Sequence, residues 1–85
     1  MITTIDVTEK DLIEGVRGYC KGCPVALAAM RATGGHVWVA TTTISLIRDG
    51  SHYSNSFPLP IFVSRNIRLF DEGCAVSPFS FKMDL

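Results

Sequence analysis

The N-terminal part of the chain shows a strand pattern followed by a short helical one. Residues 2–7 alternate between apolar and polar side chains, which predicts a strand with Ile5 and Val7 on one face. Thr8 and Asp11 have the spacing of a capping box, so a helix is expected to begin at Thr8. The expected buried face of this helix consists of Leu12, Ile13 and Val16.

A second helix is expected to start at Pro24, because proline is well tolerated at the first helical position. The apolar residues that follow have helical spacing and are mostly alanines, which lets a helix lie close against a sheet. They are Val25, Ala28, Ala29 and Ala32. The pair Gly34-Gly35 is expected to end this helix, since glycine readily adopts the conformation of a helix C-cap.

Three successive segments rich in β-branched or alternating residues predict an antiparallel meander. They are residues 36–40, 41–47 and 52–57. Asp49-Gly50 is a strong tight-turn signal between the second and the third segment. The prolines that follow residue 57 are expected to end the third strand.

A third helix is expected to open at Pro60 and to be amphipathic. Val63, Ile67 and Phe70 recur at i, i+4 and i+7, which predicts that they form its buried face. The residues expected to face water are Arg65, Arg68 and Glu72. Gly73 is expected to cap the C-terminal end of the helix.

The last segment, residues 74–84, is expected to be extended, with Phe79, Phe81 and Met83 on one face. The resulting order is β-α-α-β-β-β-α-β. It predicts an α+β fold in which two or three helices pack on one face of a mainly antiparallel sheet. With 85 residues and no linker, repeat or low-complexity stretch, the chain is expected to form a single domain over residues 1–85.

The composition indicates a globular domain with apolar surface to spare. Hydrophobic residues make up 47% of the chain and charged residues 19%. In so small a domain much apolar surface must stay outside, which favours a binding patch or a homodimer interface. Eight basic and eight acidic side chains give a formal net charge of zero, and the lack of a basic excess argues against nucleic-acid binding.

The sequence favours a cytoplasmic location. Residues 1–6 contain neither a basic stretch nor a long apolar run, so no signal peptide is expected. The longest apolar stretch, residues 24–30, is far shorter than the roughly 20 residues that span a bilayer, so no membrane partner is expected. Three cysteines without a secretion signal indicate a reducing compartment.

The local motif Cys20-Lys21-Gly22-Cys23-Pro24 has chemistry of its own. Dithiol oxidoreductases place a C-x-x-C pair at the start of a helix, where the helix dipole favours a thiolate. The segment before Cys20 is expected to be helical, which argues against the βαβ setting of such enzymes. A zinc site would need further ligands from distant segments, and the candidates are Cys74, His36 and His52.

The simpler interpretation of this motif is structural. Cys23 would then lie beside the cap of the second helix, and Cys20 would be a small apolar residue under the loop. On this interpretation neither a metal nor a cofactor is expected. A thiol-redox or zinc-binding function of Cys20 and Cys23 stays the alternative.

No residue pattern indicates catalysis. His36 and His52 each start a predicted strand, and neither is paired with a nucleophile in a recognisable motif, so the protein is not expected to be an enzyme. Aromatic and basic residues that the core does not need are better suited to recognition. The partner-binding candidates are Trp38, Arg48, His52, Tyr53, Arg65 and Arg68.

The position of Trp38 depends on which face of its strand turns inward. If Val37 and Val39 face the helices, Trp38 lies on the open face of the sheet. If the valines face outward, Trp38 belongs to the core. Apolar residues on both faces of this strand leave the two alternatives open.

Four short motifs carry a resemblance to one family. They are Ile5-Asp6-Val7-Thr8, Cys20-Lys21-Gly22-Cys23-Pro24-Val25-Ala26-Leu27-Ala28, Phe70-Asp71-Glu72-Gly73 and Val76-Ser77-Pro78-Phe79-Ser80-Phe81. In this order the chain resembles a family of small bacteriophage and prophage accessory proteins; residues 41–57 take no part in the resemblance. The resemblance implies a protein of the host cytoplasm that binds and inhibits or modulates a host protein, such as a CRISPR or other anti-phage defence component. It implies no catalytic residue.

Overall fold

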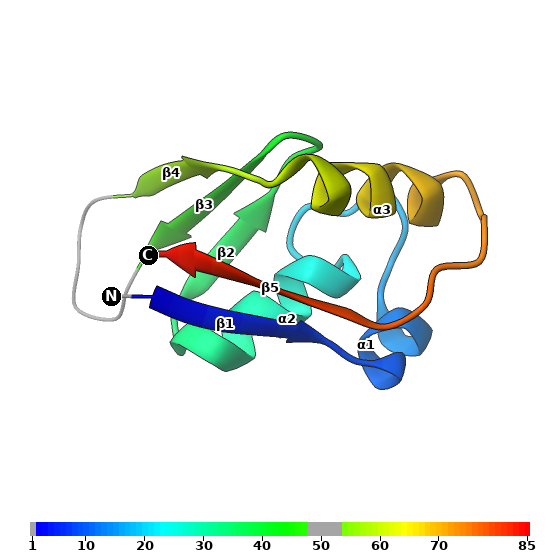
Figure 1. Ribbon diagram of the computed structural model, residues 1–85, viewed down its shortest axis with the longest axis horizontal. Helices are drawn as coiled ribbons and strands as arrows, with labels where there is room; N and C mark the ends of the chain where they lie inside the picture. The colour runs from blue at the N-terminus through cyan, green and yellow to red at the C-terminus, as the bar shows by residue number, and fades with distance from the viewer. Residues whose placement is uncertain (1, 48–53) are drawn as a thin grey trace.

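The computed structural model describes residues 2–47 and 54–85, and its elements follow the expected order (Figure 1). The strands are β1 (Ile2–Val7), β2 (His36–Val39), β3 (Thr43–Ile47), β4 (Asn55–Pro58) and β5 (Phe79–Asp84). The helices are α1 (Glu9–Glu14), α2 (Pro24–Thr33) and α3 (Ile61–Asp71). The α+β class and the order β-α-α-β-β-β-α-β are confirmed, whereas the expected turn at Asp49-Gly50 lies outside the described residues.

The described strands form two antiparallel sheets. β1 pairs with β5 along its length, from Ile2 opposite Asp84 to Val7 opposite Phe79. β2, β3 and β4 form the expected meander as a separate three-stranded sheet. The first sheet therefore joins the two ends of the chain. Apolar alternation marks both of its strands but cannot specify that they pair with each other rather than with the meander.

Helix α2 lies at the centre of the fold and contacts β1 as well as β2, so it joins the two sheets (Figure 1). Ala26, Ala28 and Ala29 are each at most 1% exposed. Such small side chains let the backbone of α2 lie close to both β1 and β2. The N-cap of α2 is Cys23, and the helix ends as expected at Gly34, whose φ of 71° is the left-handed conformation that glycine adopts without strain.

The buried apolar side chains form one cluster that spans both sheets. β1 contributes Ile5, β3 contributes Ile44 and α3 contributes Val63, and none of these three has measurable exposure. Phe81 and Met83 of β5 belong to the same cluster, as their predicted shared face requires. A single core therefore holds residues 2–47 and 54–85 together.

Helix α1 is shorter and less buried than expected. Leu12 packs against the core, but Ile13 is 75% exposed and Val16 is 53% exposed, so the prediction that these two are buried is wrong. The helix stops because Gly15 is extended, and its N–H closes the last turn on the Asp11 carbonyl. Six residues make less than two turns, and Val16 lies beyond them.

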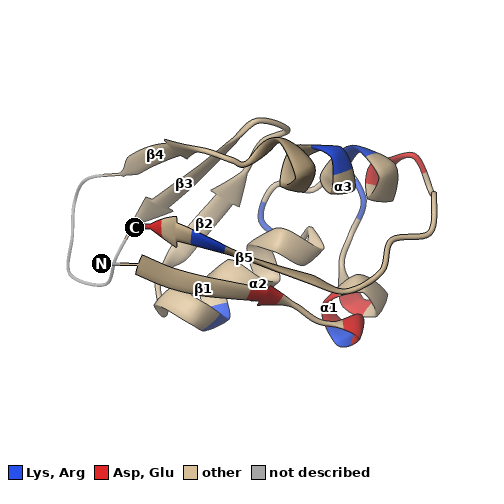
Figure 2. Cartoon of the chain, viewed as in Figure 1, with Lys and Arg blue, Asp and Glu red and all other residues tan. Residues whose placement is uncertain are grey.

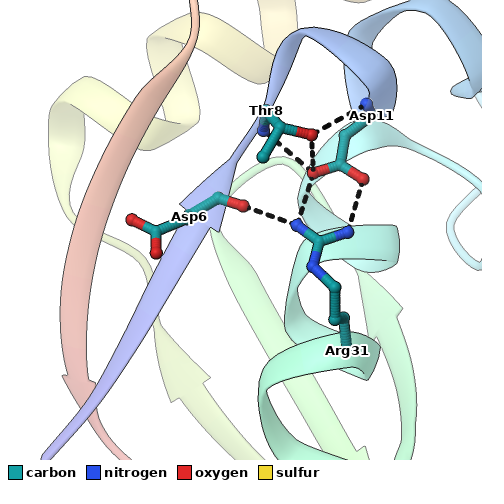
Figure 3. Close-up of polar contacts among 4 residues, drawn as sticks. All are labelled: Asp6, Thr8, Asp11 and Arg31. Atoms are coloured by element: carbon teal, nitrogen blue, oxygen red, sulfur yellow. Dashed lines mark hydrogen bonds and ion pairs between the residues drawn. The ribbon is translucent and has the colours of Figure 1, made fainter.

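An ion pair ties α1 to α2 and β1 (Figure 3). The two terminal nitrogens of Arg31 donate to the two carboxylate oxygens of Asp11, each at 2.8 Å, and Nη2 also donates to the Asp6 carbonyl at 2.8 Å. Asp11 Oδ2 accepts from the Thr8 N–H at 2.9 Å, which completes the expected capping box. The hydrogen bonds from Arg31 lower the pKa of the buried Asp11 from 3.8 to about 2.

Replacing Asp11 with asparagine should therefore destabilise the protein most at neutral pH. Since folding lowers the pKa of Asp11, its carboxylate stabilises the fold fully above the unfolded value of 3.8, and this contribution is lost as the pH falls toward about 2. The side chain of Arg31 is 53% exposed, so water screens the pair, and the expected loss is about 1–2 kcal/mol. Urea unfolding of Asp11→Asn and of the unsubstituted protein, from neutral pH into the acid range, measures this loss of stability.

The matched control is Asp6→Asn, because the hydrogen bond that joins Asp6 to Arg31 is accepted by the backbone carbonyl of Asp6 and not by its carboxylate. This variant should keep the acid sensitivity of the unsubstituted protein. A stability difference for Asp11→Asn that stays constant from neutral pH down to pH of about 2 would contradict the assignment.

Candidate functional site

The register of the three-stranded sheet sorts its side chains onto two faces. Val37 lies opposite Leu46 and Val39 lies opposite Ile44, and all four are at most 5% exposed. The valines thus face the core, and Trp38 between them lies on the other face. This outer surface, called the Trp38 face from here on, consists of His36, Trp38, Thr43, Ser45, Ile47 and Ser56.

The centre of the Trp38 face is a row of one large and two small side chains. Trp38 lies opposite Ser45 on β3, and Ser45 lies opposite Ser56 on β4. The two serine hydroxyls are 2.9 Å apart and share a hydrogen bond. Trp38 is half-buried, and the neighbour opposite it is small.

Lys21 reaches the Trp38 face from the loop before α2. Its Nζ lies 5.1 Å from the centre of the Trp38 ring, a distance at which the cation is attracted to the ring face. The loop is held in place because the Cys20 carbonyl accepts a hydrogen bond of 2.8 Å from the Val39 N–H. The sequence did not single out Lys21 as a surface residue, since this contact joins segments that no local pattern connects.

The predicted arginines lie elsewhere. Arg65 and Arg68 are exposed on α3, as their helical spacing predicted, and Figure 2 shows acidic residues following them at the end of that helix. In the described part of the chain, no hydrogen bond, ion pair or ring contact joins either arginine to Trp38 or Lys21. The remaining predicted contact residues, Arg48, His52 and Tyr53, lie outside the described residues.

The two cysteines of the C-x-x-C motif differ in their surroundings. Cys23 is 4% exposed, and its Sγ accepts a hydrogen bond of 3.4 Å from the Ala26 N–H as the N-cap of α2. Cys20 is exposed, so the expectation that it is an apolar residue under the loop is wrong. The reason is that its turn lies on the surface, where it is bonded to the edge of β2.

Two observations bear on the alternative of a thiol-redox or zinc-binding function. Burial raises the pKa of the Cys23 thiol, so this thiol is protonated more fully than an exposed cysteine. Cys74 is exposed on the segment after α3. Within residues 2–47 and 54–85, no three His, Cys, Asp or Glu side chains are grouped so that they could hold a metal ion.

A surface hollow of about 590 Å³ lies on another side of the molecule, between α1 and the segment that leads into β5. The exposed Ile13 forms part of its wall, together with Val76 and Arg17. No local pattern predicts this hollow, because it lies where the end of α1 meets a segment without regular structure. This hollow is therefore the alternative contact surface with which the Trp38 face is compared.

Comparisons with known protein families, with curated protein sequences and with solved structures found no match for this chain. No helix in the described ranges is long and apolar enough to cross a membrane. The resemblance to phage accessory proteins thus stays a prediction.

Two neighbouring substitutions test the assignment of the faces. Val37→Ala should cost about 1–3 kcal/mol of stability, because it opens a cavity in the core. Trp38→Thr should cost less than about 1 kcal/mol, because threonine suits a strand and Trp38 faces outward. Denaturant unfolding measures both, and a larger loss for Trp38→Thr than for Val37→Ala would contradict the orientation.

Proposed function

We propose that this protein acts by non-catalytic binding to a partner protein, and that the Trp38 face forms the contact. The observation that carries the proposal is the orientation of the chain's only tryptophan, which lies outside the core while the valines on either side of it are buried. Tryptophan is among the residues that most often dominate binding energy, because it buries a large area at a small cost in side-chain entropy.

The neighbours of Trp38 suit an interface. Ser45 and Ser56 offer hydroxyl groups for hydrogen bonds around the indole, and Lys21 offers a cation next to it. A large aromatic anchor inside a polar rim is the usual composition of a protein interface. A formal net charge of zero supports a protein rather than a nucleic acid as the partner.

The resemblance to bacteriophage accessory proteins supports a host protein as the partner. On that basis the bound protein is a component of a host defence or regulatory complex, such as a CRISPR effector, and binding inhibits or modulates it. A second copy of this chain is the competing occupant of the same face, since a two-fold dimer would bury the two Trp38 side chains against each other.

Trp38→Thr should weaken binding to the partner strongly. The tagged protein is expected to retain one protein from a bacterial lysate, and the variant should bind that purified partner at least about tenfold more weakly, as loss of a hot-spot side chain does. The matched control is Ile61→Ser, which alters an apolar residue that is 83% exposed on α3. Calorimetry measures both affinities, and equal losses in the two variants would contradict the role of Trp38.

The isolated protein should sediment as a monomer. If the Trp38 face binds a different protein, two copies of this chain are not expected to associate stably through the Trp38 face. Sedimentation equilibrium checks this expectation. A dimer that Trp38→Thr dissociates would identify a second copy as the occupant and would contradict the proposal of a host partner.

A further inference from the structure

The segment from Tyr19 to Cys23 is folded into a closed turn that brings the backbones of Cys20 and Cys23 close together. The Tyr19 carbonyl accepts hydrogen bonds from the N–H of Gly22 at 3.0 Å and of Cys23 at 2.9 Å, which is the pattern of a helical turn. Residues three apart in such a turn have Cα atoms about 5 Å apart. Disulfide-bonded cysteines have Cα separations of about 4.4–6.8 Å. The backbone of this turn therefore already has the dimensions of a disulfide between Cys20 and Cys23.

The turn is fixed to the rest of the molecule at several points. The Cys20 carbonyl is bonded to the Val39 N–H, and the Gly22 carbonyl accepts from the Val16 N–H, both at 2.8 Å. Cys23 is also held in place, because it is the N-cap of α2. Because the folded chain holds both cysteines, closing a bond between them costs little conformational entropy.

Both cysteines line one surface hollow of about 240 Å³, together with Val39 and Asp71. Cys20 is exposed and can meet a soluble reagent, whereas Cys23 is 4% exposed. This difference assigns separate roles to the two thiols. Cys20 is the group that a small disulfide reaches first, and Cys23 is the group that resolves the product from inside the hollow.

We propose that Cys20 and Cys23 form a thiol–disulfide site that reacts with low-molecular-weight disulfides such as oxidised glutathione. The Cys20 thiolate attacks one glutathione sulfur, the glutathione S–S bond breaks, and one glutathione leaves as a thiolate. The Cys23 thiolate then attacks Cys20 Sγ, and the second glutathione leaves. Two electrons pass from the cysteines to glutathione, and the two protons that the cysteines lose end on the two glutathione thiols. The reaction does not depend on any partner of the Trp38 face.

The test is equilibration of the reduced, full-length protein with glutathione buffers, followed by an acid quench and mass spectrometry. Cys74→Ser should lose two hydrogen atoms and carry no glutathione, and the unsubstituted protein should carry none on Cys20 or Cys23. Cys23→Ser should stop at the mixed disulfide on Cys20, and Cys20→Ser should form no internal bond. The control Cys74→Ser removes the other exposed thiol.

A second measurement on the unsubstituted protein does not depend on the folding of any variant. The equilibrium constant for internal disulfide formation should be at least about tenfold larger in the folded protein than in urea, because only the folded chain holds the turn closed. An equal or smaller constant in the folded protein would overturn the proposal. So would glutathione that stays on Cys20 of the unsubstituted protein, or an internal disulfide that joins Cys74 to Cys20 or Cys23.

Discussion

The whole structure depends on the close packing of an alanine-rich helix between two small sheets. A two-stranded sheet is marginally stable by itself, and the apolar face of a three-stranded sheet has to be covered, so both sheets need a surface to pack on. Helix α2 supplies this surface to both, and its buried Ala26, Ala28 and Ala29 keep the layers close together. Larger side chains at these positions would push the sheets apart and strain the core.

The two ends of α2 also organise the surface of the molecule. Near its C-terminal end, Arg31 binds Asp11 and the Asp6 carbonyl, which fixes α1 and β1. Ahead of its N-terminal end, the closed turn carries Lys21 onto the ring of Trp38. The proposed contact surface and the proposed thiol site are therefore neighbours, and both are positioned by the helix that forms the centre of the core.

Local patterns were enough to predict the elements of this fold. The Thr8 capping box, the proline at the start of α2 and the amphipathic spacing of α3 all depend on residues within one or two turns, and the structure confirms each of them. The division into two sheets could not be predicted in this way, because β1 pairs with β5 from the opposite end of the chain.

The candidate surface was predictable in part. The sequence identified Trp38 as a contact residue but left its face open, and only the pairing of Val37 and Val39 with β3 decides it. Lys21 was missed because its contact with Trp38 depends on a long-range backbone bond. The burial of Val16 was predicted wrongly, because helical periodicity was extended beyond Glu14, where helix α1 ends.

The most direct test of the central claim is an NMR titration of the isotope-labelled protein with its purified partner. The chain has one tryptophan and so gives a single indole N–H resonance to follow. The account predicts that this resonance shifts together with the amides of Ser45 and Ser56, while Ile13 and Val76 at the other hollow stay unchanged. Shifts at Ile13 and Val76 with an unmoved Trp38 resonance would contradict it.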